Sequence, residues 1–451
     1  MEPSQSDRHQ QDALPFAKYA KQIERIRQKI PQVIETPGAE HVFGASSHHY
    51  QLHAPITMTE LNDLEKDWGV KLPEAFAAFI TLVGNGGAGP YYGIYNVQQM
   101  KPDRTGIGIP SVLKVNLETQ DWQSENDFAL IDEDLDDEAY EEAAANLLSG
   151  TVEIGTMGSS YEILLIVSGE HEGRILYWDS EFYRPFFTYE NHFLDWYERW
   201  LDEIIAGFKI HWFGTTLGGS QQQLTELARL PEKAGIRAQA LKALLRFPYL
   251  HDTAIQVANH GLQDAAEQVR YWALTLLAAH APHLADPRLI QGLRSRQTIE
   301  RRHAAQLICW YRKKDVTLFV EEIQPLIARE TDPETFRFLG YILDSAEVDP
   351  LPVMLPAFQN SNRQIRNSAI WEAGKSSRKA DYVDAFIPIL WDDSEPSIQV
   401  TALQSLGGVT DPILLPIYEY LLQRYPNDEY SIRTHVGHRL KEFKSRKEKR
   451  T

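Results

Sequence analysis

Histidines are the first candidates for chemistry in this sequence, because His41, His48, His49 and His53 lie close together near the N-terminus. On a helix, His49 and His53 would lie on the same face and could hold a metal ion together. No cysteine or acidic residue joins them at a usual metal-ligand spacing. We therefore interpret them as histidines of a surface loop, and we predict neither a metal nor a cofactor.

Glycines form the second candidate, since Gly84, Gly86 and Gly89 have the G-x-G-x-x-G spacing of a dinucleotide-binding loop. That fingerprint needs a strand before the glycines and a helix after them. Here a predicted helix precedes them, and the strand-like residues 91–97 follow. The glycines are better explained by a tight turn with positive φ.

Motifs of known catalytic chemistry are missing from the sequence. There is no H-E-x-x-H, Walker loop, paired-cysteine motif or G-x-S-x-G elbow, so we expect no enzyme and predict no catalytic residue. The one cysteine, Cys309, cannot form an internal disulfide, which fits a reducing compartment. It lies in an apolar helical context, where burial is expected.

Carboxylates are the charged groups of the segment between Lys114 and Arg174. This segment contains no lysine or arginine. The segment lacks the glycine and the alternating spacing of a Ca²⁺ loop. Two interpretations remain, a solvated acidic helix or a surface that docks on a basic partner and steers its approach. The acidic candidates for partner binding are Asp132, Glu133, Asp134, Asp136, Asp137 and Glu138.

Overall charge narrows the class of partner. The formal net charge of −18 disfavours nucleic acid and anionic membranes and favours a basic partner. The sequence has no apolar run of about 18 residues and no signal peptide, so a cytoplasmic location is expected. A hydrophobic content of 43% is typical of a globular protein, and the length allows two or three domains.

Residues 151–207 show the elements that must position these side chains. Short apolar runs at Ile163–Val167 and Arg174–Trp178 predict two strands of a hairpin, and Val152–Ile154 predicts a third. From Phe193 to Ile204 aromatic and aliphatic residues follow the helical period on one face, with Thr188 as a candidate N-cap. The fold class is therefore α+β, an antiparallel sheet covered by helices.

The order of motifs over residues 55–206 resembles the SUKH superfamily, the Smi and Knr type domain. The motifs that carry the resemblance are Trp68-Gly69, Leu72-Pro73, Phe76, Phe79, Asn85-Gly86-Gly87, Gly155, Gly158, Tyr161-Glu162, Gly173-Arg174-Ile175 and Trp178. Many bacterial members are immunity proteins that bind toxins, often nucleases, and fungal relatives regulate cell-wall assembly. This sequence departs from the pattern by a long acidic insertion, Asp121–Ala145. The loop with Asn85, Tyr91 and Tyr92 is a second candidate partner surface.

A helical repeat follows a Gly- and Gln-rich connection at 207–223. An apolar residue followed by arginine, or by glutamine in one copy, recurs at intervals of roughly 33 residues, with a small residue three positions later. Examples are Val269-Arg270 with Ala273 and Ile365-Arg366 with Ala369. The pattern resembles HEAT-like repeats and predicts an all-α solenoid over 224–441. We expect each arginine to bond a carboxylate or carbonyl of a neighbouring repeat.

Two functions are consistent with these features. The preferred hypothesis is an immunity-type protein that neutralises a toxin, possibly a nuclease, by protein–protein binding, without nucleic acid or membrane. The alternative is a scaffold or regulatory adaptor that joins endogenous partners through the solenoid. Two terminal segments complete the predicted layout. Residues 1–54 contain a helix that ends before Pro31 and then an irregular stretch, and residues 442–451 form a basic tail.

Overall fold

The structure is a computed structural model, and it describes residues 16–100, 106–115, 135–181, 184–391 and 394–448. Residue contacts divide the chain into two compact units, Met1–Leu276 and Leu277–Thr451. The division falls inside helix α10 (Glu267–His280). Within the described ranges, no helix is long and apolar enough to cross a membrane.

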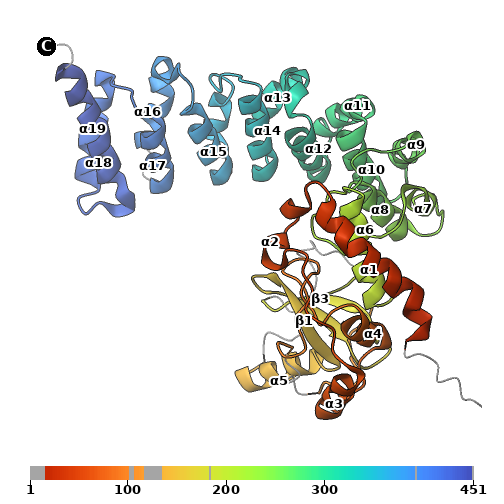
Figure 1. Cartoon of the computed structure of the whole chain (residues 1–451). Coiled ribbons are helices and arrows are strands. Elements are labelled where there is room, and N and C mark those ends of the chain that lie inside the picture. Colours follow the sequence, from red (N-terminus) through yellow and green to blue (C-terminus); the bar gives the residue numbers. More distant parts are fainter. Residues whose placement is uncertain (1–15, 101–105, 116–134, 182–183, 392–393, 449–451) are drawn as a thin grey trace, which may run out of the picture. The chain divides into compact units, whose positions relative to one another are not determined.

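A four-stranded antiparallel sheet forms the centre of the first unit (Figure 1), with strand order β1-β2-β3-β4. The strands are β1 (Thr151–Gly158), β2 (Tyr161–Ile166), β3 (Ile175–Asp179) and β4 (Arg184–Phe187). The pairing places Ile163 opposite Tyr177 and Leu164 opposite Leu176. Because side chains alternate along a strand, these two pairs face opposite sides, and both sides of the sheet are buried.

Helices cover the first side of the sheet. They are α1 (Ala20–Glu35), α2 (Ala45–His48), α3 (Met58–Trp68), α4 (Glu74–Leu82) and α6 (Phe193–Ile205). Helix α6 buries its predicted aromatic face against this side, and Phe193, Trp196 and Trp200 are at most 1% exposed. Its N-cap is His192, which accepts a hydrogen bond from the Asp195 amide at 3.3 Å. The predicted cap, Thr188, was wrong, since it closes β4 by bonding the Ile175 carbonyl.

The second side of the sheet carries a smaller core. Leu113 and the partly buried Leu147 pack on Leu164, Ile166 and Trp178. Leu147 is the last residue of α5 (Asp137–Leu147), so the C-terminal end of this helix, just after the acidic insertion, covers this side. The α+β domain is therefore layered on both sides of its sheet.

Two predicted local features need correction. The first helix was predicted to end before Pro31, but α1 continues through it to Glu35. Pro31 is exposed, where water can replace the hydrogen bond that proline cannot make. The strand-like segment after Tyr91 forms only isolated bridges, from Ile94 to Gly87 and Gly155.

The glycine-rich turn is confirmed. Gly86 has φ +77°, and a Cβ atom there would lie 2.5 Å from the Tyr95 carbonyl oxygen. Only a residue without a side chain fits such a close approach. Thr57 and Glu60 form a capping box at the start of α3.

The predicted linker, residues 207–223, lies inside the first unit, and its last three residues form the start of α7 (Gln221–Leu227). Helices α8 (Ala234–Leu244) and α9 (Asp252–Gly261) follow. Arg199 donates to Glu190 at 2.5 Å and to Glu203 at 2.7 Å, and Arg246 lies 3.2 Å from Glu203. Arg246 also donates to the Gly219 carbonyl at 2.8 Å. This buried ion cluster joins the end of the α+β layer to the first helices of the repeat region. The predicted domain boundaries stay predictions.

The second unit is all-helical. Its helices are α11 (Pro282–Leu293), α12 (Thr298–Tyr311), α13 (Val320–Ile327), α14 (Pro333–Ser345), α15 (Arg363–Ala373), α16 (Val383–Trp391), α17 (Pro396–Ser405), α18 (Leu415–Arg424) and α19 (Ile432–Glu448). Small residues allow neighbouring helices to approach, as predicted from the repeat. In the first unit, for example, a Cβ atom on Gly261 would lie 3.1 Å from that of Ala273, one of the small residues of the repeat.

The repeat arginines bond largely as expected. Arg302 donates to Asp332 at 2.7 Å and Arg237 to Asp264 at 2.9 Å, and Arg366 forms an ion pair with Glu395. Arg337 differs, since it pairs with Glu334 of its own helix. Arg237 and Arg366 also donate to carbonyls of the loops before their own helices. A guanidinium with several donors suits this double task. The expected fold class, an α+β domain followed by a solenoid-like all-α region, is confirmed, and the HEAT-like assignment stays a prediction.

Candidate partner-binding surface

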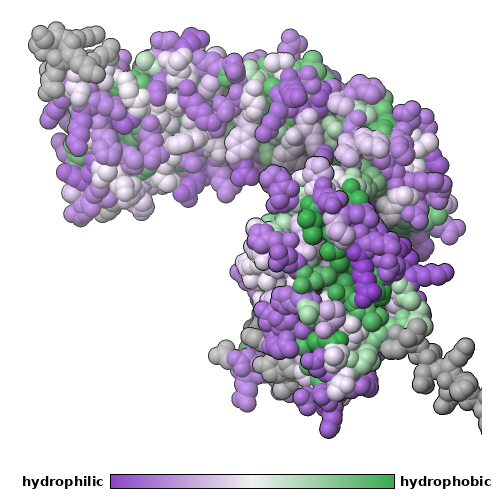
Figure 2. Space-filling view, in the orientation of Figure 1, coloured by the Kyte–Doolittle hydropathy of each residue, from purple (hydrophilic) through white to green (hydrophobic). Residues whose placement is uncertain are grey.

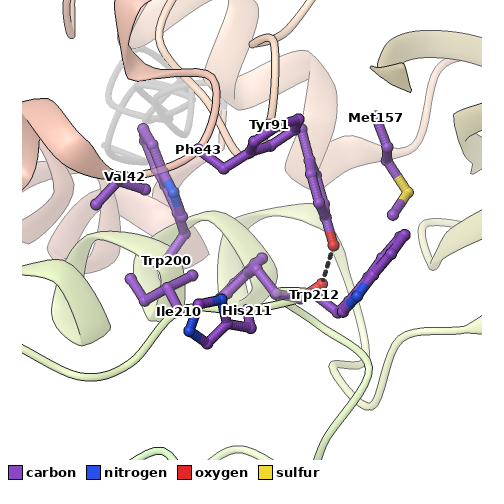
Figure 3. Close-up of a pocket in the computed structure, with 9 residues that line it drawn as sticks. Val42, Phe43, Tyr91, Met157, Trp200, Ile210, His211 and Trp212 are labelled. Carbon is purple, nitrogen blue, oxygen red and sulfur yellow. Dashed lines mark hydrogen bonds between the residues drawn. The ribbon is translucent and has the colours of Figure 1, made fainter. Parts of the chain in front are cut away.

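An apolar pocket of about 260 Å³ opens on the surface of the first unit (Figure 3). Its walls come from three parts of the chain that are distant in sequence: the loop before α2, the turn and strand around Tyr91 and Met157, and the end of α6 with the residues after it. The lining residues are Val42, Phe43, Tyr91, Met157, Trp200, Ile210, His211, Trp212 and Phe213.

Hydrogen bonds behind the pocket wall satisfy its buried polar groups. The hydroxyls of Tyr91 and Tyr177 donate to the Phe213 carbonyl at 2.9 and 2.8 Å, the first of which is drawn dashed in Figure 3. Trp196 donates its indole N–H to the Tyr177 hydroxyl at 3.0 Å. Burial raises the pKa of both tyrosines well above the usual value, so both stay neutral. The wall therefore presents mainly apolar surface.

Two residues that line the pocket have a strained backbone. Tyr91 and Trp212 have φ values of 57° and 51°, which bulky residues seldom adopt. Gly44 has φ +84°, and a Cβ atom there would lie 1.7 Å from the Tyr91 carbonyl oxygen. Such strain persists only where the surrounding packing enforces it, and it is found most often at functional sites.

Three exposed aromatic side chains lie at the pocket, and we call Phe43, Tyr92 and Trp212 the aromatic rim. Phe43 and Trp212 line the pocket, and Tyr92 packs on Phe43. The three side chains are 57%, 44% and 43% exposed. Phe43 and Tyr92 meet edge to face with ring centroids 5.4 Å apart, and Trp212 contacts Tyr161 in the same way at 5.7 Å. Figure 2 shows apolar residues gathered over part of this unit. Exposed aromatic residues around an apolar pocket are typical of protein-binding hot spots.

His48 supports the pocket from below. Its Nδ1 accepts the Tyr50 amide at 3.0 Å, and its ring packs edge to face on Trp200 at 5.8 Å. Burial lowers the pKa of His48 to about 4, so the ring is neutral at pH 7. His49 ends α2 in a left-handed conformation, so no helix aligns it with His53. The described residues contain no group of side chains suited to a metal ion.

The predicted loop residues divide into two kinds. Asn85 is buried, and its side-chain oxygen accepts the Val97 amide at 3.0 Å. Tyr91 is also buried and forms part of the pocket wall, whereas Tyr92 is exposed in the aromatic rim. Tyr92 is therefore the loop residue best placed to meet a partner.

The predicted acidic residues lie elsewhere. Asp132, Glu133 and Asp134 are outside the described residues. Asp136 accepts the Ala139 amide at 3.0 Å in the first turn of α5, Asp137 begins that helix, and Glu138 is exposed. Carboxylates at a helix N-terminus also balance the helix dipole, which gives them a structural role. Partner binding by this block stays a prediction.

Sequence reasoning missed Phe43 and Trp212. Both lie in irregular segments, where hydrophobic periodicity gives no signal. The sequence did contain a usable signal: Phe43 and Trp212 are large aromatic residues close to a glycine, Gly44 and Gly214, and neither belongs to a predicted helix or strand. Such residues have no element in which to be buried, and they are candidates for exposure.

Comparison with known families identifies part of the chain. Residues 55–199 match the model of the SMI1 / KNR4 family (SUKH-1). These residues form a SUKH-1 domain. None of the curated proteins matches the chain closely enough to serve as a relative.

Among solved structures, the chain is similar to YibA of E. coli, with 17% identity, a TM-score of 0.37, and coverage of 50% of this chain and 82% of that one. It is also similar to the complex of CpcE and CpcF of phycocyanin lyase from Nostoc sp. PCC7120. That match has 15% identity and a TM-score of 0.29, and it covers 52% of this chain and 99% of the other.

The pocket is only partly built from the SUKH-1 domain. Tyr91 and Met157 belong to the matched residues, whereas Phe43 precedes them and Trp200 and Trp212 follow them. Segments flanking the domain therefore complete the wall and most of the aromatic rim.

Proposed function

We propose that this chain is an immunity-type binding protein that neutralises a toxin domain by protein–protein binding through the aromatic rim. Two findings support the proposal: the SUKH-1 domain, a type that typically binds proteins, and the rim around the apolar pocket, which carries the argument. Binding would block the toxin sterically, so it requires no catalytic group in this chain.

The pocket sets the chemistry of the contact. A space of about 260 Å³ suits one large apolar side chain of the partner. Around it, Phe43, Tyr92 and Trp212 would exclude water from the contact, as the ring of residues around a hot spot does. Rigid walls also reduce the entropy lost on binding, since the strained backbone already holds the rings in place.

Charge selects a basic partner. The chain has a formal net charge of −18, and residues 115–173 carry no lysine or arginine. Opposite charge speeds association with a basic protein and suppresses binding of acidic competitors. A basic nuclease-type toxin domain fits this requirement.

The test is to measure the affinity of the full chain for a toxin domain encoded beside its gene. Replacing Phe43 and Trp212 together by serine should raise Kd at least about 30-fold, since hot-spot truncations cost about 2 kcal/mol or more. Tyr249→Ser is the matched control, because Tyr249 is 68% exposed in the same unit but does not line the pocket. Protection of cells from the co-expressed toxin should fall in the same order.

Equal affinities of the double variant and wild type would remove the rim from the mechanism. If the chain instead captures endogenous proteins and binds no toxin domain, the alternative of a regulatory adaptor replaces this proposal.

A further inference from the structure

A segment without helix or strand forms one wall of the pocket. Residues 209–219, which we call the connecting segment, lead from α6 to α7 and have no regular secondary structure. Residues 210–213 line the pocket, and Trp212 among them belongs to the aromatic rim (Figure 3). Connecting segments are usually more mobile than the elements that they join. Contacts with other residues must therefore hold Trp212 in place.

Arg246, in the turn after α8, holds the connecting segment at both ends. At its start, the Lys209 amide donates to the Arg246 carbonyl at 2.8 Å. At its end, the Arg246 guanidinium donates to the carbonyls of Leu217 and Gly219 at 2.5 and 2.8 Å. A single residue therefore closes the connecting segment into a loop.

The middle of the connecting segment is fixed on the α+β layer. The Phe213 carbonyl accepts hydrogen bonds from two tyrosine hydroxyls at 2.9 and 2.8 Å, and Arg199 donates to the Thr216 carbonyl at 2.9 Å. Trp212 lies between this middle anchor and the Lys209 end. Its φ of 51° persists only while the contacts on both sides hold it, because a bulky residue seldom adopts this conformation.

The Arg246 side chain is itself held firmly. It is buried, its Nε lies 3.2 Å from a carboxylate oxygen of Glu203, and its guanidinium lies 5.0 Å from the centre of the Phe247 ring. A planar guanidinium carries five donors in a fixed fork, so it can bind two carbonyls while it pairs with a carboxylate. A lysine ammonium keeps the charge but is a compact point without this fork. The identity of residue 246 therefore decides whether both carbonyls are bound.

We propose that Arg246 is a positioning residue of the partner-binding surface, which holds Trp212 in the aromatic rim by closing the connecting segment. Arg246 does not line the pocket, so it acts through the segment. A ring that is already in place loses less entropy when a partner binds, so release of the segment lowers the affinity. The inference rests on the proposed function and deepens it, because a residue outside the SUKH-1 domain then controls the rim.

A double-mutant cycle separates positioning from a general loss of stability. Arg246→Lys should raise the Kd for the toxin domain encoded beside the gene about fivefold, the factor expected for ordering one free side chain. In a Trp212→Ser background the same change should alter Kd by less than about twofold, because the ring that it positions is gone.

Arg237→Lys is the matched control. Arg237 also pairs with a carboxylate, that of Asp264 at 2.9 Å, and donates to two carbonyls, but both carbonyls lie outside the connecting segment. This variant should bind the toxin domain within about twofold of wild type, because the two sites share no partner.

Lys209→Pro tests the other end of the connecting segment without changing the buried ions. It removes the amide that donates to the Arg246 carbonyl, since proline has no backbone N–H. Its Kd should rise as in Arg246→Lys, and again only while Trp212 is present. This variant decides the question if Arg246→Lys does not fold.

Hydrogen exchange gives a readout that needs no toxin. Amides of residues 210–216 should exchange at least about tenfold faster in Arg246→Lys than in wild type, and at the wild-type rate in Arg237→Lys. An equal rise in Kd with and without Trp212, or unchanged exchange, overturns the proposal. If wild type binds no toxin domain while exchange rises as expected, the proposed function fails and the positioning of Trp212 by Arg246 stands.

Discussion

Single residues explain why the pocket keeps its shape. The Phe213 carbonyl accepts hydrogen bonds from two tyrosines, and Gly44 allows the backbone of Tyr91 to come close. His48 acts in the same way from beneath Trp200, and only its neutral form fits, because burial penalises the charged ring. The aromatic rim thus depends on uncharged, fully bonded groups below it.

His48 gives a prediction for the pH dependence of stability. Its folded pKa of about 4 lies below the ordinary value of 6.5, so between these values the unfolded chain binds more protons. Stability should therefore fall as the pH drops from about 6.5 to 4. His48→Gln keeps an acceptor for the Tyr50 amide but does not titrate, so its loss of stability from pH 7 to pH 5 should be smaller by ~1–2 kcal/mol.

Urea denaturation of both proteins at the two pH values measures this difference. His303, whose pKa burial lowers to about 3, adds the same dependence to both and cancels in the comparison. Parallel losses in wild type and variant would show that His48 titrates normally in the folded chain.

At the scale of elements, α6 and α5 contribute differently: α6 to packing, and α5 mainly to surface charge. Helix α6 is aromatic on its buried face and anchors the sheet, the helices beside it and the pocket wall. Helix α5 covers the second side of the sheet with its last residue, Leu147, while its first turn carries carboxylates. One element thus supplies stability, and the other supplies charge on the surface.

The acidic block gives a kinetic prediction. Replacing Asp132, Asp134, Asp136 and Asp137 by asparagine should slow association with a basic partner and flatten its salt dependence. The melting temperature should change little, because asparagine can replace Asp136 as the acceptor for the Ala139 amide at the start of α5. Stopped-flow measurements at low and high salt with the captured toxin domain make the comparison. Identical rates for the two proteins at both salts would exclude steering by this block.

At the scale of the whole molecule, the buried ion cluster decides how the parts of the first unit depend on one another. Glu203 ends the α+β layer, and Arg246 follows α8 in the repeat region. Burial lowers the pKa of Arg246 to about 10, so pairing with Glu203 is what keeps it charged and in place. The predicted linker lies between them and contributes the Gly219 carbonyl to the same cluster.

Arg246→Met should therefore destabilise the α+β layer from outside it. Removing one member of a buried ion pair costs about 3–5 kcal/mol, because the other charge stays buried. Arg199 still pairs with Glu203, so the lower end of that range is expected. Near-UV circular dichroism in urea follows the buried tryptophans of the α+β layer. An unchanged midpoint would indicate that the two parts fold independently, as the Gly- and Gln-rich connection alone suggested.

The sequence by itself determined the elements and their order. The strands near Ile163 and Ile175, the aromatic helix from Phe193 and the repeat arginines follow from hydrophobic period and local spacing, which act over a few residues. These signals also sufficed for the resemblance to the SUKH superfamily. Where they failed, as at Thr188 and Pro31, a competing local interaction or solvent exposure decided the outcome.

The tertiary structure alone decided which residues form the pocket. Phe43 and Trp212 stand about 170 positions apart in the sequence, and nothing local relates them. They meet because the sheet, α6 and the Phe213 carbonyl fix three irregular segments against one another. Asn85 and Tyr91 are likewise buried whereas Tyr92 is exposed, although all three belong to one loop. In irregular segments the packing of distant parts of the chain decides which side chains meet and which are buried, and the local pattern does not specify it.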